Sequence, residues 1–93
     1  MQAPRQIAGA SVIEWVSSDA PFGEVPSPTG GRPEPIYCLA ICRYEGSSSY
    51  CRFDCDKDWQ PKQDRDFHSI DEAKADVSFR YRRAHVAWRS TVR

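Results

Sequence analysis

Four cysteines occupy mirror-image positions about one turn near the middle of this chain of 93 residues. Two stand before the turn and two after it, at the same spacing: Cys38, Cys42, Cys51 and Cys55. Between them, Gly46-Ser47 is a good two-residue hairpin loop, because glycine supplies the positive φ that type I′ and II′ turns require. The pattern predicts a β-hairpin over about 36–56.

The turn also sets the register of this hairpin. With Glu45 opposite Ser48, each cysteine before the turn faces one after it. The cross-strand partners are Cys42 with Cys51, Ala40 with Phe53, and Cys38 with Cys55. Because side chains alternate along a strand, these six residues share one face. The opposite face is of mixed composition and carries Leu39, Ile41, Arg43, Tyr50, Arg52 and Asp54.

The four cysteines allow three chemical states. Zinc prefers four thiolates at about 2.3 Å, but four residues of a strand span roughly 13 Å at about 3.3 Å each. A zinc site would therefore need knuckles in place of strands. Cross-strand disulfides 38–55 and 42–51 are geometrically feasible, yet residues 1–9 lack the apolar core of a secretory signal. Buried free thiols acting as small hydrophobes are the third state, and all three stay open.

Size and charge exclude several classes of protein. The length suits one small domain, 1–93, and thirteen basic residues balance thirteen acidic ones. No apolar run approaches the ~20 residues that span a bilayer. We expect a cytoplasmic protein with no membrane contact and no cofactor. Pairing into a homodimer is one way in which so limited a core could be supplemented.

Beyond the hairpin, the chain divides into short segments. Residues 1–9 read as a loose tail, and 10–16 as a first strand. Residues 17–35 hold five of the seven prolines and three of the five glycines, which predicts a loop that is disordered or lies along the surface. A loop of this kind could also bind a partner, with Phe22 as its aromatic residue.

A capping box marks the start of a C-terminal helix. Ser69 can cap the amide of Glu72, whose carboxylate reaches back. An apolar stripe at helical spacing follows: Ile70, Ala73, Val77, Tyr81, Ala84 and Trp88. One helix over about 70–88, packed on the cysteine face, is favoured over a short strand at 85–90. The predicted fold class is α+β, with a sheet of three to four antiparallel strands and this helix on one face.

The predicted core combines both patterns. Its members come from the first strand, the cysteine face of the hairpin and the helix stripe: Ile13 or Trp15, Cys38, Ala40, Cys42, Cys51, Phe53, Cys55, Ile70, Val77, Tyr81 and Trp88.

Charge is unevenly distributed along the chain. Residues 1–77 have a net charge of −5, whereas 78–93 hold five arginines and no acid. On the predicted helix, Arg82, His85 and Arg89 share one face, where arginine forks suit carboxylate or phosphate groups. The residues of the nucleic-acid alternative are Arg80, Arg82, Arg83 and Arg89. Overall neutrality weakens that alternative, because affinity for phosphates grows with the number of cations presented.

No catalytic motif stands out. The sequence has no G-x-S-x-G elbow, phosphate loop, H-E-x-x-H or dinucleotide fingerprint. A reactive cysteine needs an exposed, electropositive thiol, whereas the predicted hairpin buries all four. We therefore expect a non-catalytic binding or accessory protein that acts through protein–protein contacts. A nucleic-acid binder and a zinc- or thiol-based module of the four cysteines are the alternatives.

One stretch resembles a known family. Residues 50–59, Tyr-Cys-Arg-Phe-Asp-Cys-Asp-Lys-Asp-Trp, are followed by Ser-Ile-Asp-Glu-Ala-Lys at 69–74 and by Trp88. This is similar to a family of small uncharacterised bacterial proteins with an aromatic strand ending in Cys-Asp and a Trp, then a Ser-Ile-x-Glu-Ala-Lys helix. The resemblance implies a compact sheet-plus-helix unit and a bacterial source, and it carries no activity.

Overall fold

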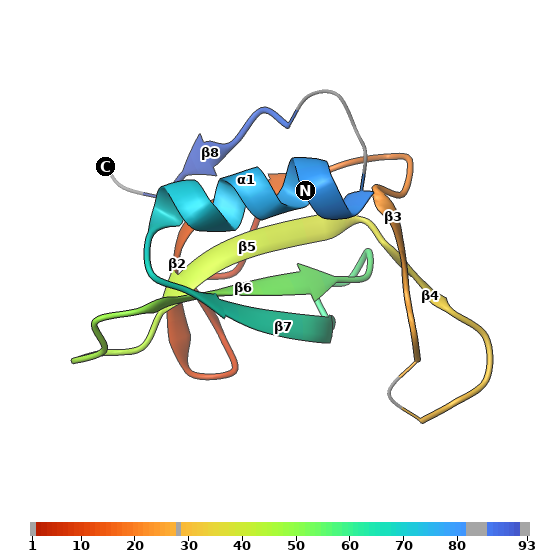
Figure 1. Cartoon of the computed structure of the whole chain (residues 1–93), viewed down its shortest axis with the longest axis horizontal. Helices are drawn as coiled ribbons and strands as arrows, with labels where there is room; N and C mark the ends of the chain where they lie inside the picture. Colours follow the sequence, from red (N-terminus) through yellow and green to blue (C-terminus); the bar gives the residue numbers. More distant parts are fainter. Residues whose placement is uncertain (1, 28, 82–85, 92–93) are drawn as a thin grey trace.

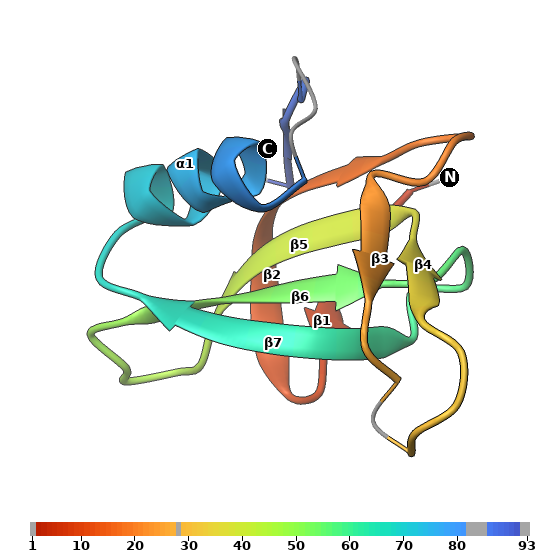
Figure 2. The same ribbon diagram turned by 45° about the vertical axis from the view of Figure 1, so that its right-hand side comes forward.

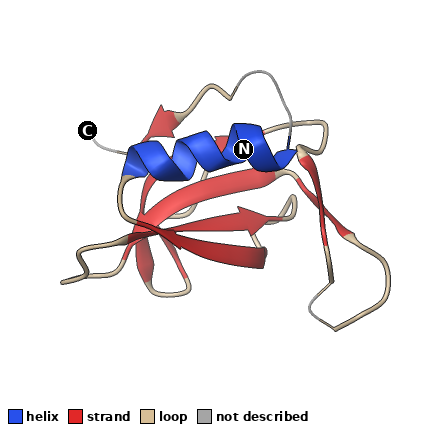
Figure 3. Cartoon of the chain, in the orientation of Figure 1, coloured by secondary structure: helices blue, strands red, loops and turns tan. Residues whose placement is uncertain are grey.

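The computed structural model describes residues 2–27, 29–81 and 86–91. One helix lies over a curled antiparallel sheet, and a second small sheet stands beside it (Figures 1 and 3). The elements are β1 (Gln6–Ile7), β2 (Ala10–Ser17), β3 (Gly23–Val25), β4 (Glu34–Ile36), β5 (Cys38–Arg43), β6 (Tyr50–Cys55), β7 (Pro61–Phe67), α1 (Ile70–Tyr81) and β8 (Arg89–Ser90). The α+β class is confirmed, with more strands than the three to four predicted.

The register of the central hairpin is confirmed. In the β5–β6 ladder, Cys38 pairs with Cys55 and Cys42 with Cys51. The loop is wider than predicted, because the strands end at Arg43 and Tyr50. The expected glycine, Gly46, has a φ of 81°.

Strand β2 carries a bulge that changes which side chains face the cysteines. Val12 pairs with Cys42 and Trp15 with Ala40, and the register shifts between Val12 and Glu14. Ile13 is the extra residue. Strict alternation from Val12 would place Trp15 on the opposite face, whereas the bulge returns its ring to the cysteine side.

The other edge of β2 is shared by both ends of the chain. In the main sheet the order is β1-β2-β5-β6-β7, and β8 also pairs with β2. Ile7 of β1 pairs with Ala10, and Arg89 of β8 pairs with Trp15 further along the same edge. Segments from opposite ends of the sequence therefore meet along one strand.

The proline-rich segment contains strands, which the prediction of a loop over 17–35 missed. β3 and β4 form a separate two-stranded antiparallel sheet that stands beside the main one (Figure 2). Pro35 lies within β4, in a sheet of only two strands, where every strand is an edge and a missing donor is tolerated. Val25 and Ile36 of this hairpin are buried.

The helix begins as predicted and ends earlier. The Glu72 amide donates to Ser69 Oγ (3.1 Å), and Glu72 Oε1 accepts from the amide of His68 (2.9 Å). The prediction of a helix to about residue 88 is wrong: α1 ends at Tyr81, residues 86–88 are irregular, and a short strand follows at 89–90. The alternative of a terminal strand is confirmed at its C-terminal end.

The helix also packs on the opposite face from the one predicted. Its Val77 and Tyr81 join a cluster with Leu39, on the face that the sequence showed as mixed. The remaining buried members of this helix-side cluster are Val16, Phe22, Val25 and Ile36. Ile70 and Trp88, both placed in the predicted core, are only partly buried.

The cysteine face is closed by the sheet itself. Its cluster gathers side chains from the curled strands and from the turn before β7: Ile7, Ala10, Val12, Trp15, Cys38, Ala40, Cys42, Cys51, Phe53, Cys55 and Trp59. The rings of Trp15 and Trp59 meet edge to face, with centroids 6.0 Å apart. This side is already filled, which is why the helix packs on the other face.

Candidate functional site

The residues predicted to bind a partner lie in different places. Phe22 is only 6% exposed and packs in the helix-side cluster, so its ring is not offered to a partner. Arg80 forms an ion pair with Asp76 (3.1 Å). Arg89 is exposed and belongs to β8, not to the helix. Arg82, Arg83 and His85 lie outside the described residues.

The cysteines are free thiols in two cross-strand pairs. Burial is the main cause that raises the pKa of Cys38 to about 11 and that of Cys42 to about 12. The pair Ala40–Phe53 separates the two cysteine pairs. Within the described ranges, no three His, Cys, Asp or Glu side chains come together as a metal site would need. The zinc alternative therefore gains no support from this geometry.

A buried ionic network joins the sheet to the helix. Arg52 is 0% and Asp54 1% exposed. Arg52 Nε and Nη2 donate to the Asp54 carboxylate (2.8 and 3.1 Å), and Nη1 donates to Ala73 O (2.9 Å). The Tyr81 hydroxyl donates to Asp54 Oδ2, and Arg52 Nη1 lies 3.0 Å from Asp76 Oδ2. The Arg52–Asp54 pair is closed to solvent, and the partly exposed Asp76 is also paired with Arg80, which indicates a structural role for the network.

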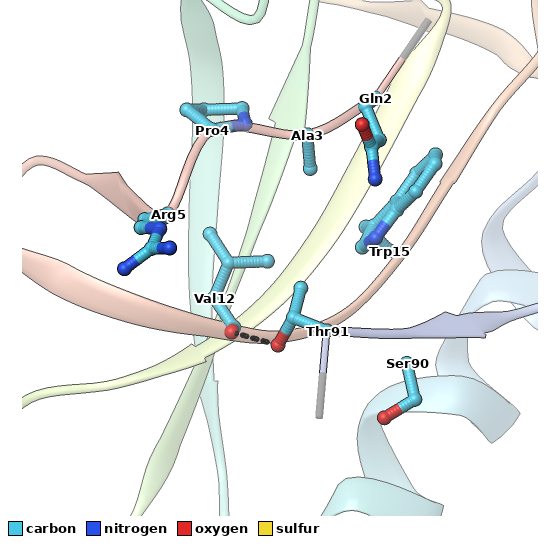
Figure 4. A pocket seen from close by; sticks show the side chains of 8 residues that line it. All are labelled: Gln2, Ala3, Pro4, Arg5, Val12, Trp15, Ser90 and Thr91. Atoms are coloured by element: carbon cyan, nitrogen blue, oxygen red, sulfur yellow. Dashed lines mark hydrogen bonds between the residues drawn. The ribbon is translucent and has the colours of Figure 1, made fainter. Parts of the chain in front are cut away.

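A cavity lies where the N-terminal segment and the β8 region meet on β2. We call it the terminal groove; it has a volume of about 610 Å³. Its walls are the N-terminal segment, β2 and the β8 region, through Gln2, Ala3, Pro4, Arg5, Val12, Trp15, Ser90 and Thr91. Figure 4 shows Gln2 and Ala3 directed across the groove towards β2. Its apolar floor comes from Val12 and Trp15.

The bulge in β2 holds one wall of this groove. Thr91 N donates to Ile13 O (3.0 Å), and Thr91 Oγ1 donates to Val12 O (2.6 Å), the contact drawn in Figure 4. On the other side, Val12 N donates to Arg5 O (2.9 Å). Backbone bonds at and beside the bulge therefore position both terminal segments.

The electrostatics of the groove are cationic. The guanidinium carbon of Arg89 lies 5.6 Å from the centroid of the Trp15 ring, within the range of a cation–π contact. Arg5 lines the groove and is exposed. Of the described residues, none of those lining the groove is acidic, and neither Arg5 nor Arg89 has an ion-pair partner among them.

A second, smaller hollow opens near Cys38. Its volume is about 430 Å³, and its lining residues are Ser17, Ser18, Asp19, Tyr37, Cys38 and Lys57. The Lys57 ammonium lies 4.7 Å from the Tyr37 ring centroid. Cys38 is only 2% exposed and has a raised pKa, so this hollow does not present an activated thiol.

Comparison with known proteins adds no assignment. Neither the family models, nor the curated proteins, nor the solved structures contain a match to this chain. In the described part of the chain, no helix has the length and apolarity needed to cross a membrane.

Sequence reasoning singled out Arg89, which lies beside the groove, and missed the residues that line it. Arg5 stood in a segment predicted to be a loose tail, and Trp15 was considered only as core. Two weak signals existed. Trp15 is the one tryptophan of the expected first strand, 10–16, and Thr91 is a β-branched residue next to the short strand that was the alternative to a longer helix.

Proposed function

We propose that this chain is a non-catalytic binding protein that acts through protein–protein contacts, with the terminal groove as its contact surface. One observation carries the proposal: Arg5 lines an open groove, Arg89 lies over the Trp15 ring beside it, and neither arginine has an acidic partner within the described residues. Tryptophan and arginine are enriched among the residues that dominate binding energy at protein interfaces.

Two further observations support a binding role over catalysis. Burial raises the pKa values of the Cys38 and Cys42 thiols to about 11 and 12, so neither is a ready nucleophile at neutral pH. The buried Arg52 and Asp54 are fully occupied with one another and with the helix.

The test is affinity capture from native lysate of the source cells, with and without nuclease and read by mass spectrometry. The wild-type protein is compared with Ala3→Trp, which puts a large ring into the groove. Glu45→Trp is the matched control, because Glu45 is exposed in the β5–β6 loop. Circular dichroism and urea unfolding confirm that both variants are folded.

A discrete protein that is retained after nuclease, lost with Ala3→Trp and kept with Glu45→Trp supports the proposal. Capture that Ala3→Trp leaves unchanged contradicts the groove as the contact surface. Material that disappears with nuclease favours the nucleic-acid alternative instead.

A further inference from the structure

We infer that the terminal groove recognises an acidic, partly apolar peptide segment, with Arg5 and Arg89 as the donors to its carboxylates. The inference rests on the proposed function and names the chemistry of the partner.

Some basic side chains of the described residues form ion pairs and others do not. Four basic side chains are engaged in ion pairs within the described residues: Arg52, Lys62, Lys74 and Arg80. Arg5, which lines the groove, and Arg89, which lies over the Trp15 ring beside it, have no such partner in the described part of the chain. Arg32, Arg43, Lys57 and Arg65 also lack one within the described residues; none of these four lines the groove, and Lys57 lines the smaller hollow. The groove therefore differs from the smaller hollow, because two unpaired cations lie at or beside it and only one lies at the hollow.

The position of Arg89 over the Trp15 ring favours a carboxylate as its ligand. A guanidinium placed over an aromatic ring can keep its N–H groups directed outward in the plane of the fork. A carboxylate matches that fork with two parallel hydrogen bonds. Trp15 is 6% exposed, so the ring acts as a support for Arg89 more than as an open face.

A partner is not expected to bind in this groove by adding a strand to β2. Carbonyl oxygens of β2 beside the groove are already used, because Val12 O and Ile13 O both accept from Thr91. A partner cannot pair with them as a new strand while β8 is in place. Recognition in this groove therefore falls to side chains.

The groove suits a peptide better than a nucleic acid. Single-stranded nucleic acids stack their bases on open aromatic faces, and the Trp15 ring is covered. The chain is neutral overall, which gives little long-range attraction for a polyanion. A short segment suits the arginines through its acidic side chains, and its aliphatic side chains can pack on Ala3 and Pro4, which are more exposed than Trp15.

The probe is a capped peptide of three Glu-Leu repeats, titrated into the 15N-labelled full chain and followed by amide chemical shifts. The same peptide with Gln in place of Glu is the comparison ligand. We expect saturable shifts at residues 2–5, 12–15 and 89–91 with the Glu peptide, and at least tenfold weaker binding of the Gln peptide.

Variants assign the effect to the two arginines. Arg5→Gln and Arg89→Gln should each raise the Kd about tenfold, as expected for losing one charged contact. Arg32→Gln removes the same charge from the β3–β4 loop and should change the Kd less than about twofold. Equal binding of both peptides, shifts that map elsewhere, or a thymidine hexanucleotide that binds as tightly at the groove would overturn the inference.

The two proposals fail in different ways. If Ala3→Trp abolishes capture of a protein but the Glu peptide does not bind, the groove remains a contact surface and its acidic preference is wrong. If Ala3→Trp leaves capture intact, the inference falls with the proposed function.

Discussion

Both faces of the main sheet carry an apolar cluster, and the helix side adds a buried pair of charged side chains. On the cysteine side, four uncharged thiols pack among aromatic and aliphatic side chains. On the helix side, Arg52 and Asp54 are buried together with contacts to the helix at Ala73, Asp76 and Tyr81. Apolar packing is non-directional. A guanidinium fork, in contrast, donates its hydrogen bonds only to acceptors that lie in the plane and direction of its N–H groups.

The comparison shows why the helix lies where it does. An apolar stripe alone could cover any apolar face. The helix side offers Arg52 and Asp54, which would be costly to bury unless something satisfied their remaining donors and acceptors. The carbonyl of Ala73 and the hydroxyl of Tyr81 do this. Ionic matching on one face thus gives the helix a fixed position that hydrophobic contact would not.

The largest expected effect comes from removing the guanidinium. Arg52→Met should lower the free energy of unfolding by about 3–5 kcal/mol, because Asp54 would stay buried without its cation. Urea unfolding measures this. The double variant Arg52→Met with Asp54→Leu should recover most of the loss. Arg65→Met, at an exposed site, should cost less than about 0.5 kcal/mol, and a similar loss at both sites would contradict the network's importance.

The next effect probes the contact between the small sheet and the helix. A Cβ added at Gly23 would lie 2.6 Å from Cδ1 of the Tyr81 ring. Gly23→Ala should therefore displace the ring, weaken its bond to Asp54 and cost about 1–3 kcal/mol. Glu24→Ala, on the exposed face of the same strand, is the control. A stabilised Gly23→Ala variant would show that Tyr81 moves away without loss.

The buried thiols of the cysteine side should make the free energy of unfolding depend on pH in alkaline solution. Burial raises the pKa of Cys42 to about 12, from 9.0 for an ordinary thiol. Between these values the unfolded chain loses a proton that the folded chain keeps, so stability falls as pH rises above about 9. One such thiol contributes about 1.4 kcal/mol per pH unit.

Cys42→Ala should flatten this dependence, measured by urea unfolding at several pH values between 8 and 10.5. The Tyr81 hydroxyl, whose pKa burial also raises, stays in both proteins and does not confuse the difference. Identical slopes for wild type and variant would mean that Cys42 is not protected in the folded chain.

The smallest effect concerns the helix without touching either face. Ser69→Ala removes the Oγ that accepts from the Glu72 amide and should cost about 1 kcal/mol. Ser69→Asp, which restores an acceptor, should be close to wild type. Thermal unfolding distinguishes the two. A silent Ser69→Ala variant would show that packing alone sets the start of the helix.

Local signals were sufficient for part of this fold. The register of the cysteine hairpin follows from one turn and the alternation of side chains, and the start of the helix follows from a capping box of four residues. Both depend on contacts between residues close in the chain, where sequence patterns are informative.

The features that sequence reasoning missed are settled by distant contacts. The bulge at Ile13 brings Trp15 to the cysteine side. The carbonyl of Ile13 accepts a hydrogen bond from the amide of Thr91, which is far along the chain. The mixed face of the hairpin was indistinguishable from a solvated one, because Arg52 and Asp54 are typical surface residues until a helix covers them. The groove could not be predicted from local patterns either, because it forms only where the N-terminal segment and the β8 region meet on β2.

The meeting of the two ends on β2 also bears on how this protein can be re-engineered. Residues 2–5 and 90–91 line the same groove, so a tag or fusion partner joined close to residue 2 or residue 91 begins beside it. Domains with adjacent ends tolerate being rejoined and opened elsewhere. A circular permutant opened between Gly30 and Gly31, at the exposed tip of the β3–β4 hairpin (Figure 2), would carry its new ends away from the groove. Such a molecule could be immobilised without obstructing the surface under test.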